Sequence, residues 1–195
     1  MSIATRSRTR LLTLLLLGLL ILPACGALAP QAGSTATAAV IVAAPSTTPD
    51  WFNIKMTDVR TGQIFSMNDF SGKVVLVETM AEWCSTCLQQ QMEVKKLQGL
   101  TNNSQDLVHV SLDTDFHEDA ASLKEYAATW GFDWYFAVAP LEVDRALGNL
   151  YSAEFMNPPF APMLFIDRQG SVHVLPFGIK KAEALQSALA PYLAP

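Results

Sequence analysis

Residues 72–87 read GKVVLVETMAEWCSTC, and this stretch decides the fold class. Its first part, Lys73–Thr79, is short, apolar and rich in β-branched residues, which predicts a buried strand. It ends with Cys84 and Cys87, where the next segment takes on helical composition. The pair therefore lies where a strand end meets the amino terminus of a helix. Unpaired backbone N–H groups and the helix dipole stabilise a thiolate there, so we expect a redox pair.

The two cysteines have different expected roles. Two intervening residues in a first helical turn bring the sulfurs close enough to form a small disulfide ring. Cys84 lies nearer the helix end and is expected nearer the surface, so it should attack substrate disulfides. Cys87, one turn further in, should resolve the mixed disulfide. A purely structural disulfide is disfavoured, because so short a ring removes little entropy from the unfolded chain.

Short β-branched or aromatic runs alternate with helical segments on both sides of the motif. We expect strands at residues 73–79, 106–112, 134–138 and 163–167, and helices at residues 88–100, 119–130, 141–151 and 180–193. Gly131 is a helix stop, and Gly170 is the turn of a hairpin that continues through residues 171–177. This alternation predicts an α/β fold with a mixed central sheet that is flanked by helices on both faces.

The sequence resembles the thioredoxin superfamily, specifically its membrane-tethered extracytoplasmic thiol-disulfide oxidoreductases. In that branch a Gly-Lys pair opens an apolar strand, and Ala-x-Trp precedes the Cys-x-x-Cys motif, as in residues 72–87. A second block, residues 161–170 (APMLFIDRQG), is similar to the family's cis-proline loop, strand and turn. The resemblance implies a thioredoxin-like domain over residues 51–195. It also implies that Pro162 is the cis-proline and that Trp83, Ala161 and Pro162 contact the substrate.

Glu78 is the most informative residue after the cysteines. The four residues before it are apolar on both faces of the predicted strand, so a carboxylate that continues the strand is buried at a cost. In the resembling family a buried acid six residues before the first cysteine relays protons to the resolving thiol. Glu78 would then have a raised pKa and serve Cys87 as a base. In the alternative interpretation the strand ends at Val77 and Glu78 reaches solvent.

The resemblance implies a reductase for disulfides of exported proteins, for example in cytochrome c maturation, which a membrane thiol-electron donor regenerates. No cofactor is expected beyond the redox-active disulfide of Cys84 and Cys87, and no metal ion. Ser85 and Thr86 replace the Gly-Pro pair of common thioredoxins, so the direction of electron flow stays open.

Two alternatives remain within the fold, a thiol oxidant and a copper metallochaperone. Copper-delivering relatives separate their cysteines by three residues and place a histidine before the late strand, whereas residues 158–162 contain none. A zinc site is disfavoured because it needs four ligands and no second cysteine pair is present. A peroxidase is disfavoured because two cysteines at this spacing form a local disulfide.

The first 25 residues predict a targeting signal. Three arginines precede the apolar stretch Leu11–Leu22, which is shorter than the roughly 20 residues of a membrane span. Residues 22–25 (LPAC) resemble the lipobox of bacterial lipoproteins, so we expect a lipid on Cys25 that also accounts for the odd third cysteine. An ordinary signal peptide is the alternative. Residues 26–50 are rich in Ala, Ser, Thr and Pro and predict a flexible linker, in which residues 38–44 are unusually apolar.

The charge balance excludes some partners. The chain has 18 acidic and 13 basic residues, and three of the basic ones lie in the first ten positions. The predicted domain is therefore strongly acidic, which disfavours nucleic acid. Together these expectations place a lipid-anchored domain on the extracytoplasmic face of a bacterial membrane, where its substrates are exported thiol or disulfide proteins.

Overall fold

The computed structural model describes residues 48–193 of the chain. The expectations that fall before residue 48 lie outside these residues: the export signal, the lipid on Cys25, and the linker with its apolar stretch 38–44. Among the described residues, no helix combines the length and apolar character needed to cross a membrane.

A mixed five-stranded sheet lies at the centre, with the strand order β5-β4-β3-β6-β7. The central strand β3 (Val74–Met80) pairs in parallel with β4 (Leu107–Asp113) and antiparallel with β6 (Met163–Ile166). Beyond them, β5 (Tyr135–Val138) runs parallel to β4, and β7 (Val172–Val174) runs antiparallel to β6. Strands β3, β4, β5 and β7 therefore run in the same direction and end at the same edge of the sheet, where the redox motif follows β3.

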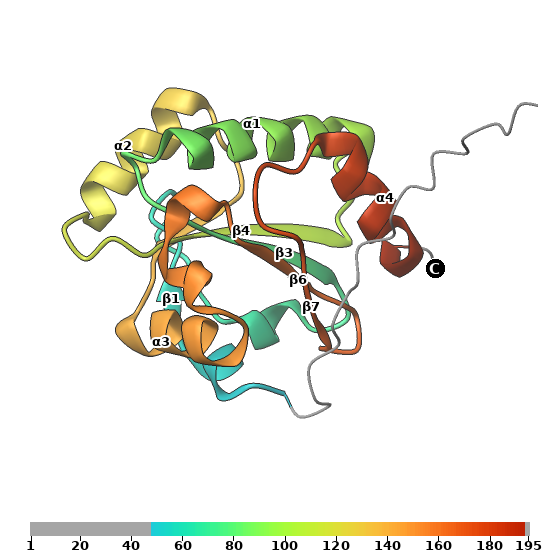
Figure 1. Ribbon diagram of the computed structural model, residues 1–195, viewed down its shortest axis with the longest axis horizontal. Helices are drawn as coiled ribbons and strands as arrows, with labels where there is room; N and C mark the ends of the chain where they lie inside the picture. Colours follow the sequence, from blue (N-terminus) through green and yellow to red (C-terminus); the bar gives the residue numbers. More distant parts are fainter. Residues whose placement is uncertain (1–47, 194–195) are drawn as a thin grey trace, which may run out of the picture. The chain divides into compact units, whose positions relative to one another are not determined.

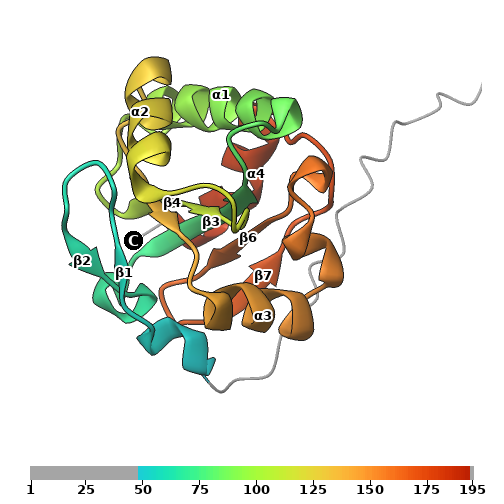
Figure 2. The same cartoon turned by 90° about the vertical axis from the view of Figure 1, so that its left-hand side faces the viewer.

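Helices cover both faces of this sheet. Helices α1 (Ser85–Leu100), α2 (Ala120–Trp130) and α4 (Ala182–Leu193) lie on one side, and α3 (Leu141–Leu150) lies on the other, as Figures 1 and 2 show. The second face is completed by a small hairpin of β1 (Met56–Thr57) and β2 (Ile64–Phe65).

The pattern of β3 explains why both faces must be covered. All seven of its residues are buried. Val74, Leu76 and Met80 belong to the core shared with α1, α2 and α4, whereas Val75 and Val77 belong to the core under α3. Because successive strand residues point to opposite faces, an apolar run of this length fits a strand between two helical layers.

The α/β class and the mixed sheet flanked by helices are confirmed, with every predicted strand and helix present and its boundaries shifted by one turn or less. Helix α1 starts at Ser85, so the motif forms its first turn, and Gly131 ends α2 with a left-handed φ of 62°. The sequence analysis missed the β1–β2 hairpin and four short 3-10 helices, η1 (Asp50–Asn53), η2 (Met67–Phe70), η3 (Ala153–Met156) and η4 (Pro158–Phe160).

Candidate active site

Cys84 and Cys87 form a disulfide at the amino terminus of α1. Cys84 is the N-cap residue of this helix, and the backbone N–H of Cys87 donates to its sulfur at 3.1 Å. This donor belongs to the group of N–H bonds that a helix start leaves without a carbonyl partner. When the disulfide is reduced, the same N–H and the helix dipole stabilise a thiolate on Cys84.

The burial of the two cysteines differs from the expectation. Cys84 was predicted to lie nearer the surface, but both residues are only 2% exposed. Cys87 is covered by η4, which packs against α1 and places the carbonyl oxygen of Pro158 3.4 Å from the Cys87 sulfur. In the reduced protein the Cys87 thiol can donate a hydrogen bond to that carbonyl.

The loop that carries Ala161 and Pro162 follows η4 directly. Both residues are buried, and the backbone N–H of Thr79 on β3 donates to the carbonyl of Pro162 at 3.3 Å. Ala161 has a left-handed φ of 45°, which a non-glycine residue adopts only when its surroundings hold it there. The strand β3 and the 3-10 helix η4 thus fix this loop from both ends.

Lys180 stabilises the backbone conformation of Ala161. Its ammonium group donates to the carbonyls of Ala161 (2.6 Å), Gly178 (2.6 Å) and Pro176 (3.1 Å). The side-chain amide of Gln90 on α1 brackets the Lys180 backbone with one donated and one accepted hydrogen bond. The motif helix is therefore linked through Gln90 and Lys180 to the residue before Pro162.

Glu78 lies inside the protein on β3, only 4% exposed, so the alternative that it reaches solvent is wrong. In the sheet it is opposite Ser111 of β4, whose hydroxyl donates to the Glu78 carboxylate at 2.5 Å. Trp134 donates its indole N–H to the same hydroxyl at 2.8 Å. By the alternation of β3, Glu78 points to the face of Leu76 and Met80, which is also the face of both cysteines.

This environment sets the protonation of Glu78. Burial raises the pKa of Glu78 to about 7, and the Ser111 hydroxyl, the Gln91 amide and the charge of Lys180 act against that rise. Burial also lowers the pKa of Lys180 to about 8, an effect that the charge on Glu78 opposes. A carboxyl group that titrates near neutral pH can both accept and return a proton during catalysis.

Exposed apolar side chains lie on the loops next to the redox pair. Trp83 is 62% exposed, and its indole N–H donates to Asp115 at 2.6 Å. Phe160, next to Ala161, is exposed and lies edge-on to Phe177 at 6.3 Å between ring centroids. Phe116, beside Asp115, is the most exposed of the large apolar residues, at 87%. These exposed side chains form an apolar rim beside the motif, and the contact of Trp83 with the substrate stays a prediction.

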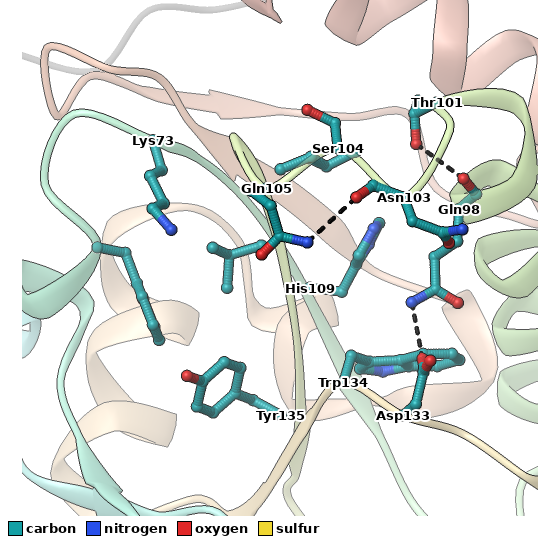
Figure 3. A pocket seen from close by; sticks show the side chains of 13 residues that line it. Lys73, Gln98, Thr101, Asn103, Ser104, Gln105, His109, Asp133, Trp134 and Tyr135 are labelled. Carbon is teal, nitrogen blue, oxygen red and sulfur yellow. Dashed lines mark hydrogen bonds between the residues drawn. The ribbon is translucent and has the colours of Figure 1, made fainter.

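A separate pocket of about 320 Å³ lies at the other end of the sheet (Figure 3). It is lined by residues at the start of β3, β4 and β5 and at the carboxyl end of α1, including Lys73, Gln98, His109 and Trp134. Burial lowers the pKa of His109 to about 4. The redox motif follows the carboxyl end of β3, so this pocket lies at the opposite end of that strand from the cysteines.

No protein-family model matches the sequence, and no curated protein matches it. Solved structures do match. A thioredoxin-family thiol:disulfide interchange protein from Chlorobium tepidum aligns with a TM-score of 0.57 and 21% identity, over 72% of this chain and 93% of its own. The chain has the thioredoxin fold.

Two further solved structures also align with this chain. The thioredoxin domain of a thiol-disulfide oxidoreductase from Bacteroides vulgatus aligns with a TM-score of 0.58 and 19% identity, over 78% of this chain and 99% of its own. A SCO1/SenC family lipoprotein from Bacillus anthracis aligns with a TM-score of 0.59 and 19% identity, over 72% and 93%. The thioredoxin fold is thus shared with both disulfide oxidoreductases and the SCO1/SenC family.

On this thioredoxin fold, the predicted residues Glu78, Trp83, Cys84 and Cys87 come from one continuous segment, and the loop of Ala161 and Pro162 is tied to it through Thr79 and Lys180. Sequence reasoning missed Lys180, which it placed inside a helix, and the Ser111 hydroxyl that holds Glu78. Only the pairing of β3 with β4 brings Ser111 opposite Glu78, and only the loop before α4 brings Lys180 to Ala161.

Proposed function

We propose that this chain is an extracytoplasmic thiol-disulfide oxidoreductase that reduces disulfides in other proteins. The observation that carries the proposal is the Cys84–Cys87 disulfide at the start of α1, on the sheet face that also buries Glu78. Disulfide exchange proceeds through a thiolate, and a base with a near-neutral pKa can deprotonate the resolving thiol.

In the first step the Cys84 thiolate attacks one sulfur of a substrate disulfide. A bond forms between Cys84 and that sulfur, the substrate bond breaks, and the second substrate sulfur leaves as a thiolate that takes a proton. The backbone N–H of Cys87, which donates to the Cys84 sulfur, stabilises the attacking anion.

In the second step Cys87 resolves the mixed disulfide. Glu78 takes the proton of the Cys87 thiol through water, and the thiolate attacks the Cys84 sulfur. The Cys84–Cys87 disulfide forms and the first substrate sulfur is released as a thiolate. The substrate gains two electrons and the chain loses two, so a thiol donor must reduce the chain again.

The apolar rim supports a protein substrate. Trp83, Phe116, Phe160 and Phe177 offer exposed aromatic surface beside a disulfide that is itself almost fully buried. Such a surface suits an unfolded or extended polypeptide, whose apolar side chains can cover it, better than a small polar thiol. The Ala161–Pro162 loop lies next to this rim, and its two carbonyls are held by Lys180 and Thr79.

The predicted placement of the chain completes the proposal. A lipid on Cys25 would hold the domain at the outer face of the membrane, within reach of exported proteins such as apocytochrome c and of a membrane thiol-electron donor. This part rests on the resemblance of residues 22–25 to a lipobox and of residues 72–87 to the membrane-tethered branch of the family.

The reduction potential tests the direction of electron flow. We expect equilibration of the purified protein against dithiothreitol or glutathione buffers to give about −250 mV or lower, as for reductants of this fold. A value of about −120 mV would assign the chain as a thiol oxidant instead.

Two cysteine variants test the order of attack. Cys87→Ser should accumulate a mixed disulfide with a disulfide-bonded test protein, because the resolving thiol is gone, whereas Cys84→Ser should form none. Mass spectrometry of the non-reduced adducts measures both. Equal adduct formation by the two variants would contradict the assignment of Cys84 as the attacking thiol.

Copper delivery, which the sequence left open as an alternative, is the second candidate, and the SCO1/SenC family lipoprotein shares the fold of this chain. The two-residue spacing of the cysteines argues against it. A reduced chain that binds one copper ion tightly and fails to reduce protein disulfides would establish copper delivery in place of the reductase.

A further inference from the structure

Three carboxylates lie together beside the redox motif, and none of them takes part in the proposed disulfide exchange. Glu82 lies two residues before Cys84, Asp113 is the last residue of β4, and Glu118 lies just before α2. One carboxylate oxygen of each lies within 4.8 Å of those of the other two. The backbone holds the group in place, because the N–H of Glu82 donates to both oxygens of Glu118, at 2.8 and 3.0 Å.

Two oxygens of this group are buried and lack a donor among the described residues. Asp113 is 1% exposed, and its Oδ1 accepts from the backbone of Asp115, but its Oδ2 has no partner. The Oε1 of Glu82 is buried in the same way. No lysine, arginine or histidine within the described residues forms an ion pair with the three, and the nearby His117 pairs with Asp115 instead.

Such a group needs a positive partner. Burial, the negative charges of Glu118 and Glu82 and a carboxyl–carboxyl hydrogen bond with Glu118 raise the pKa of Asp113 to about 8, against the backbone hydrogen bond from Asp115. Burial and the charge of Glu118 also raise the pKa of Glu82. Buried carboxylates in proteins are neutralised by a proton, by a basic side chain or by a metal ion, and the second of these is absent from this group.

The geometry and the ligand type select the class of ion. Carboxylate oxygens within 4.8 Å of one another can all contact one hard divalent cation, and Ca²⁺ accepts irregular geometry whereas Mg²⁺ demands a near-ideal octahedron. An all-oxygen set suits Ca²⁺, Mg²⁺ or Mn²⁺, whereas zinc and copper prefer nitrogen and sulfur. We propose that Glu82, Asp113 and Glu118 form a binding site for a hard divalent cation, with Ca²⁺ as the best match and water completing its shell on the exposed side.

Ion binding here should couple to the cysteines, a consequence that rests on the proposed function. A cation held by Glu82 adds positive charge near Cys84 and favours its thiolate. By linkage, Ca²⁺ should then bind the reduced chain more tightly than the oxidised chain, and should make the disulfide easier to reduce to the same extent.

Isothermal titration calorimetry of the oxidised, chelator-treated protein with CaCl₂ tests the site itself. We expect one Ca²⁺ per chain, with a dissociation constant of about 10⁻⁴ to 10⁻³ M as in extracellular calcium modules, and a rise in the thermal unfolding midpoint with Ca²⁺. Asp113→Asn and Glu118→Gln should each weaken binding at least about tenfold, because each removes a charged ligand. In chelator at pH 9, above the pKa of Asp113, Asp113→Asn should unfold at a higher temperature than the wild type, because it removes a buried charge, and Ca²⁺ should raise its unfolding temperature less than that of the wild type.

Glu125→Gln is the matched control. Glu125 is an exposed acid on α2 whose charge acts on Glu82 but which is not part of the group, so its loss removes the same charge from the same neighbourhood. Its Ca²⁺ affinity should stay within about twofold of the wild type.

Absence of heat and of a thermal shift with about 10 mM Ca²⁺, Mg²⁺ or Mn²⁺ would overturn the proposal and assign the group as a shared-proton cluster. Unchanged affinity in Asp113→Asn would overturn it as well. Because these measurements use the oxidised protein and no substrate, their failure is distinct from failure of the proposed function, which the reduction potential decides.

Discussion

The charge state of Glu78 links the stability of the oxidised protein to pH. Its pKa is raised from 4.5 to about 7 by burial, so the unfolded chain loses this proton at lower pH than the folded chain. Stability therefore falls as pH rises from about 4.5 to about 7 and is then constant, with a total loss of roughly 3 kcal/mol from this group.

Glu78→Gln should remove this loss. At pH 8 the oxidised variant should be more stable than the wild type by roughly 2 to 3 kcal/mol, and the advantage should vanish toward pH 4. Urea unfolding without reductant measures the difference between the two proteins at each pH. Asp113, whose pKa is also raised, is present in both proteins, so its contribution to the pH dependence cancels in the difference. Parallel stability curves would mean that Glu78 ionises normally.

Lys180 is the second residue whose charge is built into the site. Its positive charge lowers the pKa of Glu78, so Lys180→Met should move that pKa upward. It should also lower the free energy of unfolding by about 2 kcal/mol, because three carbonyls, including that of the buried Ala161, lose a charged donor.

A pH–rate profile for disulfide reduction separates the two effects of Lys180. The limb assigned to Glu78 should shift to higher pH in Lys180→Met and stay near its wild-type position in Lys180→Arg, which keeps the charge. If the profile does not move while stability drops, Lys180 has a structural role alone.

At the scale of elements, two glycines near helix ends make opposite predictions. Gly131 caps α2 with a φ of 62°, and an added Cβ would lie 3.3 Å from the Lys95 ammonium. Gly131→Ala should therefore cost about 1 kcal/mol. Gly99, in the last turn of α1, has open space around it and ordinary helical backbone, so Gly99→Ala should be neutral or stabilise by up to about 0.5 kcal/mol. Thermal unfolding of both variants measures the contrast, and equal effects would show that φ is not the deciding factor.

The elements also show what sequence alone can predict. The apolar run of β3 and the helical composition after Cys87 are local signals, so the sheet centre, the motif and the burial of Glu78 follow from them. Strands β1 and β2 have two residues each, too few for an alternating pattern to be read. The cover that η4 places over Cys87 and the contact of Lys180 with Ala161 are long-range, and no local pattern encodes them.

At the scale of the described molecule, Arg168 joins distant parts of the chain. It lies in the turn after β6 and donates to the carbonyls of Gly72, Tyr192 and Leu193 and to the carboxylate of Asp106. The end of α4 is thereby fastened to the segments that lead into β3 and β4.

Arg168→Met should lower the free energy of unfolding by about 2 kcal/mol. It should also increase the amide exchange rate at the end of α4 more than in the rest of the described residues. Arg145→Met is the control, since Arg145 is exposed on α3 and makes no side-chain hydrogen bond within the described residues. Equal amide exchange in the two variants would contradict the role of Arg168 in holding the end of α4.

The near-complete burial of the disulfide has a kinetic consequence. Each cysteine of the disulfide is only 2% exposed, which leaves a freely diffusing thiol almost no room to approach the sulfurs. Small thiols should therefore exchange slowly with this chain even where the thermodynamics favour the reaction, and a protein donor that displaces the cover should exchange quickly. The reduced thiols can then persist in an oxidising compartment until a partner protein binds.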